Sequence, residues 1–236
     1  PVINVGRFTD PEVMIKAINS GQCDIIGAAR PSIADPFLPK KIEEGLYNDI
    51  RECIGCNICV SRWEKGGPPI WCTQNPTSGE EYRRGWHPEK YVPTDNPDLP
   101  IVVVGAGPAG LECAMTLGLR GYNTVHLIEA EAEIGGHLRW VSKLPGFGAW
   151  KRVIDWRETQ IRTKTNVQII LNNRLNYQDI LECGAERIVF ATGSNWDETG
   201  MSSLLHDDIA GANASKPEIC TPEQYCVHGK KLGKRV

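Results

Sequence analysis

The sequence lacks a long hydrophobic run and a strong excess of charge of either sign. It has 236 residues, of which 41% are hydrophobic and 23% charged, and its formal net charge is −3. No apolar segment approaches the roughly 18 residues that a membrane-spanning helix needs, and no basic excess marks a surface for nucleic acid. We therefore expect a protein that binds neither membranes nor nucleic acid. Its length is sufficient for one large domain or two smaller ones.

The sequence also lacks an even number of cysteines, and it lacks histidines at the spacing of a metal site. An odd total of nine Cys argues against a disulfide framework, and no secretory leader is recognisable, so we expect free thiols in a cytoplasmic protein. The five His show no spacing typical of a metal site. Only His137 follows a glycine pair closely enough to contact a ligand, and we interpret the other four as structural.

Four of the cysteines nevertheless form a ligand pattern. Cys53, Cys56 and Cys59 are separated by two residues each, and Cys72 follows after twelve more. Three closely spaced thiolates and one distant thiolate can surround an iron–sulfur cluster, and Gly55 permits a sharp turn between them. A structural zinc site is the alternative, although it more often uses two separate Cys pairs. The pattern predicts a 4Fe–4S cluster bound by all four cysteines.

The first 50 residues have the pattern of a βαβ unit. Residues 2–5 and 24–26 are strand-like runs, and Asp10-Pro11 between them begins a helix that Gly21 ends. Parallel strands need such a crossover. Small residues and an arginine follow each strand, at the ends that form the active face of an α/β barrel and often hold a phosphate, although either arginine alone would more often be a surface cation. The predicted phosphate-binding residues are Gly6, Arg7, Ala29 and Arg30.

A dinucleotide-binding pattern follows further along the chain. The apolar run 101–104 leads into three glycines and a helix, and a second strand ends at Glu129, nineteen residues beyond the third glycine. Glycines here make a tight turn, admit a pyrophosphate and allow close helix–strand packing, while Glu129 would accept hydrogen bonds from ribose hydroxyls. The pattern leaves FAD, NAD and ADP open. The predicted contacts are Gly105, Gly107, Pro108, Ala109, Gly110, Glu129, Gly136, His137 and Leu138.

Composition also predicts the domain boundaries. Residues 91–97 contain two Pro and several short polar residues, as linkers do. Residues 2–5 resemble a buried strand, and residues 229–236 resemble the approach to another, so we expect a segment of a longer polypeptide. The expected parts are the last βα units of a barrel in residues 1–50, a cluster segment with a linker in 51–97, and an incomplete nucleotide-binding domain in 98–236.

In this order, the segments resemble the trimethylamine dehydrogenase family. That family includes dimethylamine and histamine dehydrogenases; 2,4-dienoyl-CoA reductase and other old yellow enzyme-like iron–sulfur flavoproteins are wider relatives. The loop Cys53-Ile-Gly-Cys-Asn-Ile-Cys59 and the stretch 79–88 are similar to the amine dehydrogenase branch in particular. The other similar segments are residues 6–11, 26–37, 72–76, 105–110 and 157–160.

The resemblance implies both a fold and an activity. It implies an FMN-bearing TIM barrel, of which this chain holds the C-terminal end, then a 4Fe–4S cluster and a Rossmann-like domain with ADP, or with FAD as in the reductase relative. The four strand-end residues would hold the FMN phosphate. A small amine would reduce FMN, and electrons would pass singly through the cluster to an electron-transferring flavoprotein. The resemblance places the catalytic residues upstream of this chain, and we expect a homodimer.

Three other functions are compatible with the sequence. An NAD(P)H-dependent enoyl reductase of the dienoyl-CoA type would pass electrons in the opposite direction through FAD. A bare electron-transfer module would hold cluster and nucleotide without a substrate site, and a zinc-containing nucleotide-binding domain would have a redox-silent metal. The sequence names neither the amine nor the acceptor. We expect that these 236 residues alone do not oxidise an amine.

Overall fold

The computed structural model of the chain describes residues 1–64, 69–202, 204, 206–231 and 233. They form two compact units, Pro1–Ala191 and Thr192–Val236. All residues of the predicted sites lie in the first unit. Over the part of the chain that is described, no helix combines the length and the apolar character that crossing a bilayer requires.

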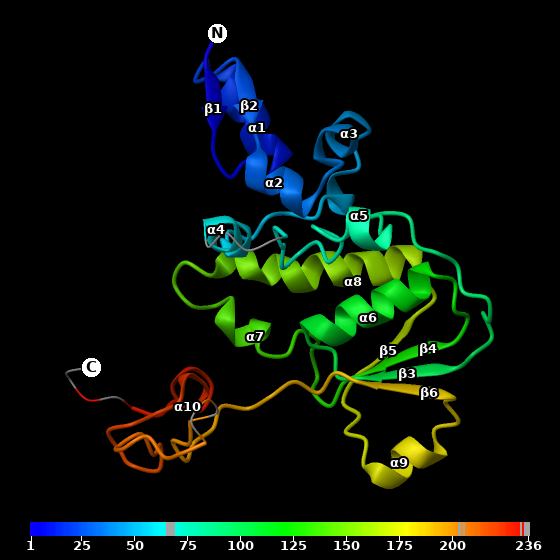
Figure 1. Cartoon of the computed structure of the whole chain (residues 1–236), viewed down its shortest axis with the longest axis vertical. Helices are drawn as coiled ribbons and strands as arrows, with labels where there is room; N and C mark the ends of the chain where they lie inside the picture. Colours follow the sequence, from blue (N-terminus) through cyan, green and yellow to red (C-terminus); the bar gives the residue numbers. More distant parts are fainter. Residues whose placement is uncertain (65–68, 203, 205, 232, 234–236) are drawn as a thin grey trace. The chain divides into compact units, whose positions relative to one another are not determined.

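The N-terminal part of the first unit is a parallel βαβ arrangement, as the sequence predicts (Figure 1). Strands β1 (Ile3–Val5) and β2 (Ile25–Gly27) pair in parallel, with Val5 opposite Gly27, and α1 (Pro11–Asn19) connects them. Asp10 caps α1 because its side chain accepts a hydrogen bond from the Glu12 amide at 2.8 Å. The strand β1 forms where expected, but its predicted burial is wrong, since Ile3 and Val5 are 60% and 67% exposed.

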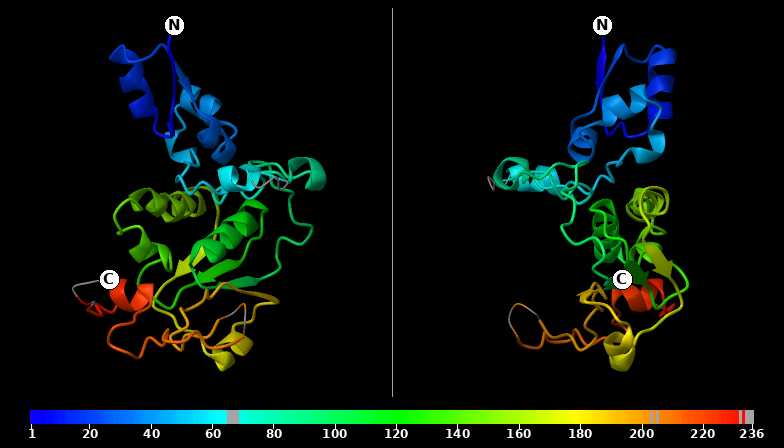
Figure 2. Two further views of the ribbon diagram at one scale, coloured as in Figure 1. Left: turned by 60° about the vertical axis from the view of Figure 1, so that its left-hand side comes forward. Right: turned by 90° about the vertical axis from the view of Figure 1, so that its right-hand side faces the viewer.

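Short helices continue from this unit toward the cysteine loop. They are α2 (Ala29–Ala34), α3 (Leu38–Glu43) and the 3₁₀ helix η1 (Tyr47–Asp49). Met14, Leu38 and Ile50 form a small apolar core between them and α1. Figure 2 shows, in both views, that the segment with α4 (Ile58–Glu64) and α5 (Glu81–Arg84) lies between this part and the larger sheet.

The larger sheet has four parallel strands in the order β5-β4-β3-β6. The central strand β3 is a continuous apolar run that a fully buried position permits, and Val102 and Val103 are buried. This arrangement confirms the predicted α/β class and Rossmann-like sheet. The strands are β3 (Ile101–Val104), β4 (Val125–Ile128), β5 (Gln168–Ile170) and β6 (Arg187–Phe190).

Helices cover this sheet on both sides. Figure 1 shows α6 (Pro108–Leu119) and α8 (Arg152–Lys164) side by side over one face, whereas α9 (Tyr177–Glu182) lies on the other. The connection from β4 to α8 contains α7 (Leu138–Val141) and the 3₁₀ helix η2 (Gly148–Lys151). The buried core consists of Val103, Ala106, Leu111, Ala114, Met115, Val125, Leu127, Ile134, Ile154 and Ile161.

The second unit has little regular structure in its described residues. A single antiparallel bridge joins Met201 to Asp208, and α10 (Pro222–Cys226) begins with a capping box formed by Thr221 and Gln224. The predicted approach to a strand is not formed at 229–231 and 233. Residues 232 and 234–236 of that prediction lie outside the described residues.

Candidate functional site

The four predicted phosphate-binding residues lie at one edge of the small sheet. Gly6 and Arg7 follow β1, whereas Ala29 and Arg30 begin α2 directly after β2. The parallel register places both strand ends at the same edge, so the structure brings the two pairs together. Each pair offers a guanidinium next to a residue with little or no side chain, a combination suited to an oxygen-rich anion.

Both arginines also bind the cysteine loop, which the sequence did not predict. Arg7 Nη1 donates to the Cys53 carbonyl oxygen at 2.8 Å, and Arg30 Nη1 donates to the Asn57 side-chain oxygen at 2.5 Å. A guanidinium has five N–H donors, so these contacts leave donors for a phosphate. The loop and the strand ends therefore form one continuous site.

The cysteine loop turns through left-handed conformations that its residues tolerate. Gly55 has φ +72° and Asn57 has φ +59°. A Cβ added to Gly55 would lie 3.1 Å from Arg7 Nε, so the absent side chain also makes room for the guanidinium. Helix α4 begins at Ile58, which places Cys59 in its first turn.

Cys72 approaches this loop from a separate segment. Its Sγ accepts a hydrogen bond from the Gln74 amide at 3.4 Å, and Cys56 Sγ lies 3.1 Å from the Thr73 hydroxyl oxygen. Burial raises the pKa of the Cys72 thiol, and the amides of Gln74 and Asn75 offset part of that rise. Charges on Cys56 and Cys53 raise the pKa of Cys72 further.

The cysteines do not converge on a single point. Within residues 1–64, 69–202, 204, 206–231 and 233, no three His, Cys, Asp or Glu side chains come together as one metal ion would require. A four-iron cluster needs a wider arrangement, because each of its thiolates binds a different iron atom. The assignment of the four ligands to a cluster stays a prediction, with one zinc ion as its alternative.

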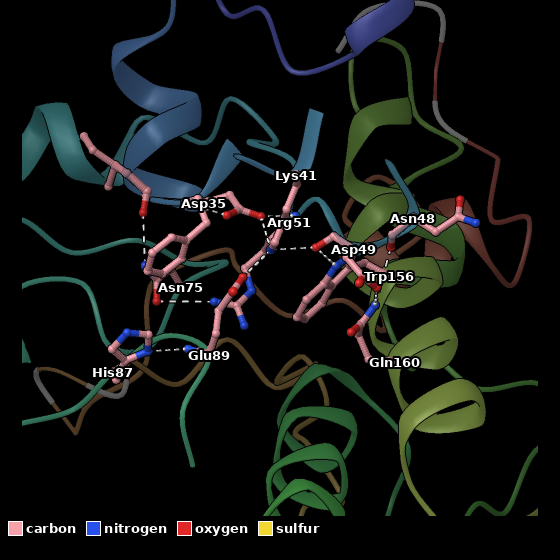
Figure 3. A network of polar contacts seen from close by, with 12 residues as sticks. Asp35, Lys41, Asn48, Asp49, Arg51, Asn75, His87, Glu89, Trp156 and Gln160 are labelled. Carbon is pink, nitrogen blue, oxygen red and sulfur yellow. Dashed lines mark hydrogen bonds and ion pairs between the residues drawn. The ribbon is translucent and has the colours of Figure 1, made fainter. Parts of the chain in front are cut away.

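A buried polar network anchors the segment that follows Cys72 (Figure 3). Asn75 is 1% exposed; its amide donates to the Ile33 carbonyl at 3.1 Å, and its Oδ1 accepts from Arg51 Nη1 at 3.3 Å. The backbone amide of Arg51 in turn donates to Asp35 Oδ2 at 2.8 Å, and Lys41 pairs with the same oxygen at 2.7 Å. Sequence reasoning missed this network, because Asn75-Pro76 signals only a turn and nothing local indicates its long-range partners.

The glycine-rich loop has the geometry that a pyrophosphate site requires. Gly105 has φ +98°, and a Cβ added to Gly110 would lie 1.8 Å from the Gly105 carbonyl oxygen. A Cβ added to Gly107 would meet nothing within 4 Å, so the space in front of that residue is open. Pro108, Ala109 and Gly110 form the first turn of the twelve-residue helix α6, whose amides and dipole favour an anion.

Glu129 closes this loop from the end of β4. It is 9% exposed; its Oε2 accepts from the Ala106 amide at 2.8 Å and its Oε1 from the Glu131 amide at 3.0 Å. Each carboxylate oxygen can accept a second hydrogen bond, so a ribose hydroxyl remains a possible donor. The charge on this residue would disfavour a ligand with a 2′-phosphate.

The predicted loop around Gly136 lies against the glycine-rich loop. The Gly135 amide donates to the Ala106 carbonyl at 2.8 Å, and a Cβ on Gly136 would lie 3.2 Å from Gly107 Cα. His137 precedes α7, and Leu138 packs against the buried core. The structure thus brings the predicted nucleotide contacts of this domain into one region.

Known proteins match the chain over the same parts. Residues 1–49 match the NADH:flavin oxidoreductase / NADH oxidase family, and residues 99–218 match pyridine nucleotide-disulphide oxidoreductase. Dimethylamine dehydrogenase of Hyphomicrobium sp. (strain x) is 53% identical over 241 residues, which cover 100% of this chain and 32% of that protein.

Two solved structures are similar as well. Histamine dehydrogenase from Rhizobium sp. 4-9 has a TM-score of 0.90 at 46% identity, over 98% of this chain and 33% of its own. The 6-hydroxypseudooxynicotine amine oxidase from Pseudomonas geniculata N1 has the same TM-score and identity, over 98% and 34%. The chain spans about a third of the length of these relatives. With residues 99–218 in the pyridine nucleotide-disulphide oxidoreductase family and its whole length matched by dimethylamine dehydrogenase, the chain belongs to the trimethylamine dehydrogenase family.

Proposed function

We propose that the chain is the electron-transfer part of an iron–sulfur flavoprotein amine dehydrogenase. Its residues would hold a 4Fe–4S cluster, the phosphate of FMN and an adenine nucleotide. When bound, FMN takes up the electrons of an amine and the cluster carries them one at a time. The similarity to dimethylamine and histamine dehydrogenases supports this function.

The contact between Arg7 and Cys53 carries the proposal. Arg7 lies at the strand end that would hold the FMN phosphate, and its guanidinium donates to the carbonyl of Cys53, the first of the four predicted ligands, at 2.8 Å. Arg30 makes the second such connection, to Asn57 in the same loop. A flavin held by these arginines would therefore be a near neighbour of a cluster held by the loop, as electron transfer between the two requires.

The residues present fit the cluster and the nucleotide. The amide that donates to Cys72 Sγ would stabilise a thiolate there. The open space at Gly107 and the buried Glu129 fit a pyrophosphate and a ribose, in the roles that the sequence predicts for them. We assign ADP to this site, because the amine dehydrogenase branch is the one that the chain resembles.

The partners follow from the same proposal. A small amine would be the substrate, and an electron-transferring flavoprotein would accept the electrons. We place the enzyme in the reducing cytoplasm, where the five cysteines that are not proposed ligands would stay as thiols. The amine oxidation itself would need catalytic residues outside these 236 residues, and we propose that the complete enzyme is a homodimer.

The nucleotide released from the purified chain tests the proposal. The chain would be purified under nitrogen, its visible spectrum recorded, and the nucleotide identified after denaturation. We expect iron–sulfur absorption and ADP, with no turnover of trimethylamine, dimethylamine or histamine by the chain alone. Release of FAD would instead favour the NAD(P)H-dependent enoyl reductase. A colourless chain without bound nucleotide would contradict both functions.

A further inference from the structure

The buried guanidinium of Arg157 lies at the junction of the cysteine segment and the nucleotide-binding helix. Arg157 belongs to α8 and is 3% exposed. Its Nε donates to Glu112 Oε2 at 2.7 Å, its Nη1 to Gln74 Oε1 at 3.0 Å, and its Nη2 to the Gln74 carbonyl at 3.3 Å. Nη1 also donates to the Val153 carbonyl one turn back, at 3.1 Å. The side chain is therefore held by two other segments and by its own helix.

Gln74 contacts both Arg157 and Cys72. It is 2% exposed and lies in a segment without regular structure. Its amide donates to Cys72 Sγ, while its carbonyl and its side-chain oxygen both accept from Arg157. Because helix or sheet pairing does not hold this residue, its orientation toward the sulfur depends on the guanidinium.

The charge of Arg157 also reaches the sulfur. Burial and the charge of Arg51 lower the pKa of Arg157, and attraction to Glu112 and, more weakly, to Cys72 offsets part of that effect. The group keeps its proton at neutral pH because an arginine in a protein does not lose it. A positive charge and a hydrogen bond to a ligand sulfur both favour the more negative, reduced form of an iron–sulfur cluster.

We propose that Arg157 is a positioning residue for the cluster, holding Gln74 against Cys72 and raising the reduction potential of the cluster. The inference rests on the proposed function, because it needs the cluster to be present. Arg157 also connects two parts of the chain, because its partner Glu112 lies on α6. The first turn of this helix follows Gly107, a predicted nucleotide contact. Gln74, Arg157 and Glu112 therefore link Cys72 to helix α6.

The test is an EPR-monitored redox titration of the full 236-residue chain after anaerobic loading with iron and sulfide. Arg157→Met is expected to move the midpoint potential to a lower value, and Arg157→Lys, which keeps the charge but loses the planar fork, to give an intermediate value. Arg162→Met is the matched control, since Arg162 lies on the exposed face of the same helix and pairs there with Glu158. It is expected to leave the potential unchanged.

Glu112→Gln is a second variant, and it is expected to shift the midpoint potential in the direction opposite to that of Arg157→Met. It keeps the shape of the pair and removes the negative charge beside Arg157, so the potential should rise. This variant decides the question if Arg157→Met fails to load iron. Equal potentials in the wild type, Arg157→Met and Glu112→Gln, with only thermal stability lowered, would overturn the inference and leave Arg157 as a packing residue. A wild-type chain that takes up no iron would overturn the proposed function itself, and this inference with it.

Discussion

At the residue scale, two glycines of one loop have different physical reasons to be glycine. Gly110 faces the Gly105 carbonyl at a distance that no Cβ tolerates, whereas the space beside Gly107 is empty of protein atoms. Backbone conformation does not separate them, because Gly107 has φ −72° and Ala could adopt it. Gly110 is therefore required by the fold, whereas we propose that Gly107 is glycine because a ligand lies against it.

Substituting each glycine by alanine should separate folding from binding. Gly110→Ala should destabilise the chain by about 1–3 kcal/mol through overpacking against backbone. Gly107→Ala should change the free energy of unfolding by less than about 0.5 kcal/mol but weaken adenine nucleotide binding by ~10-fold or more, a loss of about 1.4 kcal/mol. Urea unfolding and calorimetric titration with ADP measure the two effects. Equal loss of stability in both variants would refute this division.

At the element scale, the buried carboxylate of Asp35 joins α3 to the start of the cysteine segment. It is 2% exposed and accepts from Lys41 Nζ at 2.7 Å, from the Arg51 amide at 2.8 Å and from the Phe37 amide at 3.0 Å. Lys41 also pairs with Glu89, which follows the last of the four predicted ligand cysteines in the sequence. The carboxylate thus holds together elements far apart in the sequence.

Removing that carboxylate should be costly. Asp35→Ala leaves a buried ammonium with one partner fewer and removes the acceptor of two backbone amides, so we expect a loss of about 3 kcal/mol in the free energy of unfolding. Glu44→Ala removes an exposed partner of Lys40, at 3.7 Å, and should cost less than about 1 kcal/mol. Chemical denaturation of the two variants gives the comparison. A loss for Asp35→Ala as small as that for Glu44→Ala would show that the network is dispensable.

A pH dependence is expected at the contact between η1 and α8. Asp49 is partly buried, which raises its pKa, but hydrogen bonds from Lys164 and Gln160 and the charges of Lys164 and Lys41 lower it more. Its pKa in the folded chain therefore lies below the ordinary value of 3.8. A carboxyl of this kind stabilises the fold above its unfolded pKa, and the stabilisation is lost as the pH falls toward the folded pKa.

The wild type and the Asp49→Asn variant should differ in how steeply their urea unfolding midpoints depend on pH. Urea midpoints measured from pH 6 downward should fall more steeply for the wild type than for the variant below about pH 5. Asp155→Asn is a suitable comparison, because Asp155 lies on the exposed face of α8 and pairs there with Lys151. Parallel curves for the wild type and Asp49→Asn would show that this carboxyl does not contribute.

At the scale of the whole first unit, the cysteine segment connects two α/β parts. Arg7 and Arg30 reach it from the small sheet, and Arg157 reaches it from the Rossmann-like domain. In each of these three contacts a guanidinium donates to a backbone or amide oxygen. Charged hydrogen bonds from both parts therefore help to hold the segment that would carry the cluster.

Much of this organisation could be predicted from local patterns. The apolar run 101–104, the spacing of the glycines and the acid at 129 predict a strand, a turn and a helix, because each signal acts on its own neighbours. The parallel strands at 3–5 and 25–27 follow from similar signals. These predictions are confirmed as elements, while the ligands that they would bind remain proposals.

The long-range contacts could not be predicted in the same way. Arg157 and Gln74 are 83 residues apart, and Arg7 and Cys53 are 46 apart. No periodicity connects such pairs, since their meeting depends on how whole elements pack. The exposure of Ile3 and Val5 has the same origin: composition predicts a strand, but burial depends on neighbours that the local pattern does not specify.

The central claim is that Cys53, Cys56, Cys59 and Cys72 hold one iron–sulfur cluster. The most direct measurement is the iron and acid-labile sulfide content of the anaerobically purified chain, compared with Cys72→Ser and with Cys113→Ser, a change in α6 away from the predicted ligands. We expect about four irons and four sulfides per chain, lost or strongly reduced in Cys72→Ser and retained in Cys113→Ser. One zinc per chain, or iron that survives in Cys72→Ser as fully as in Cys113→Ser, would contradict it.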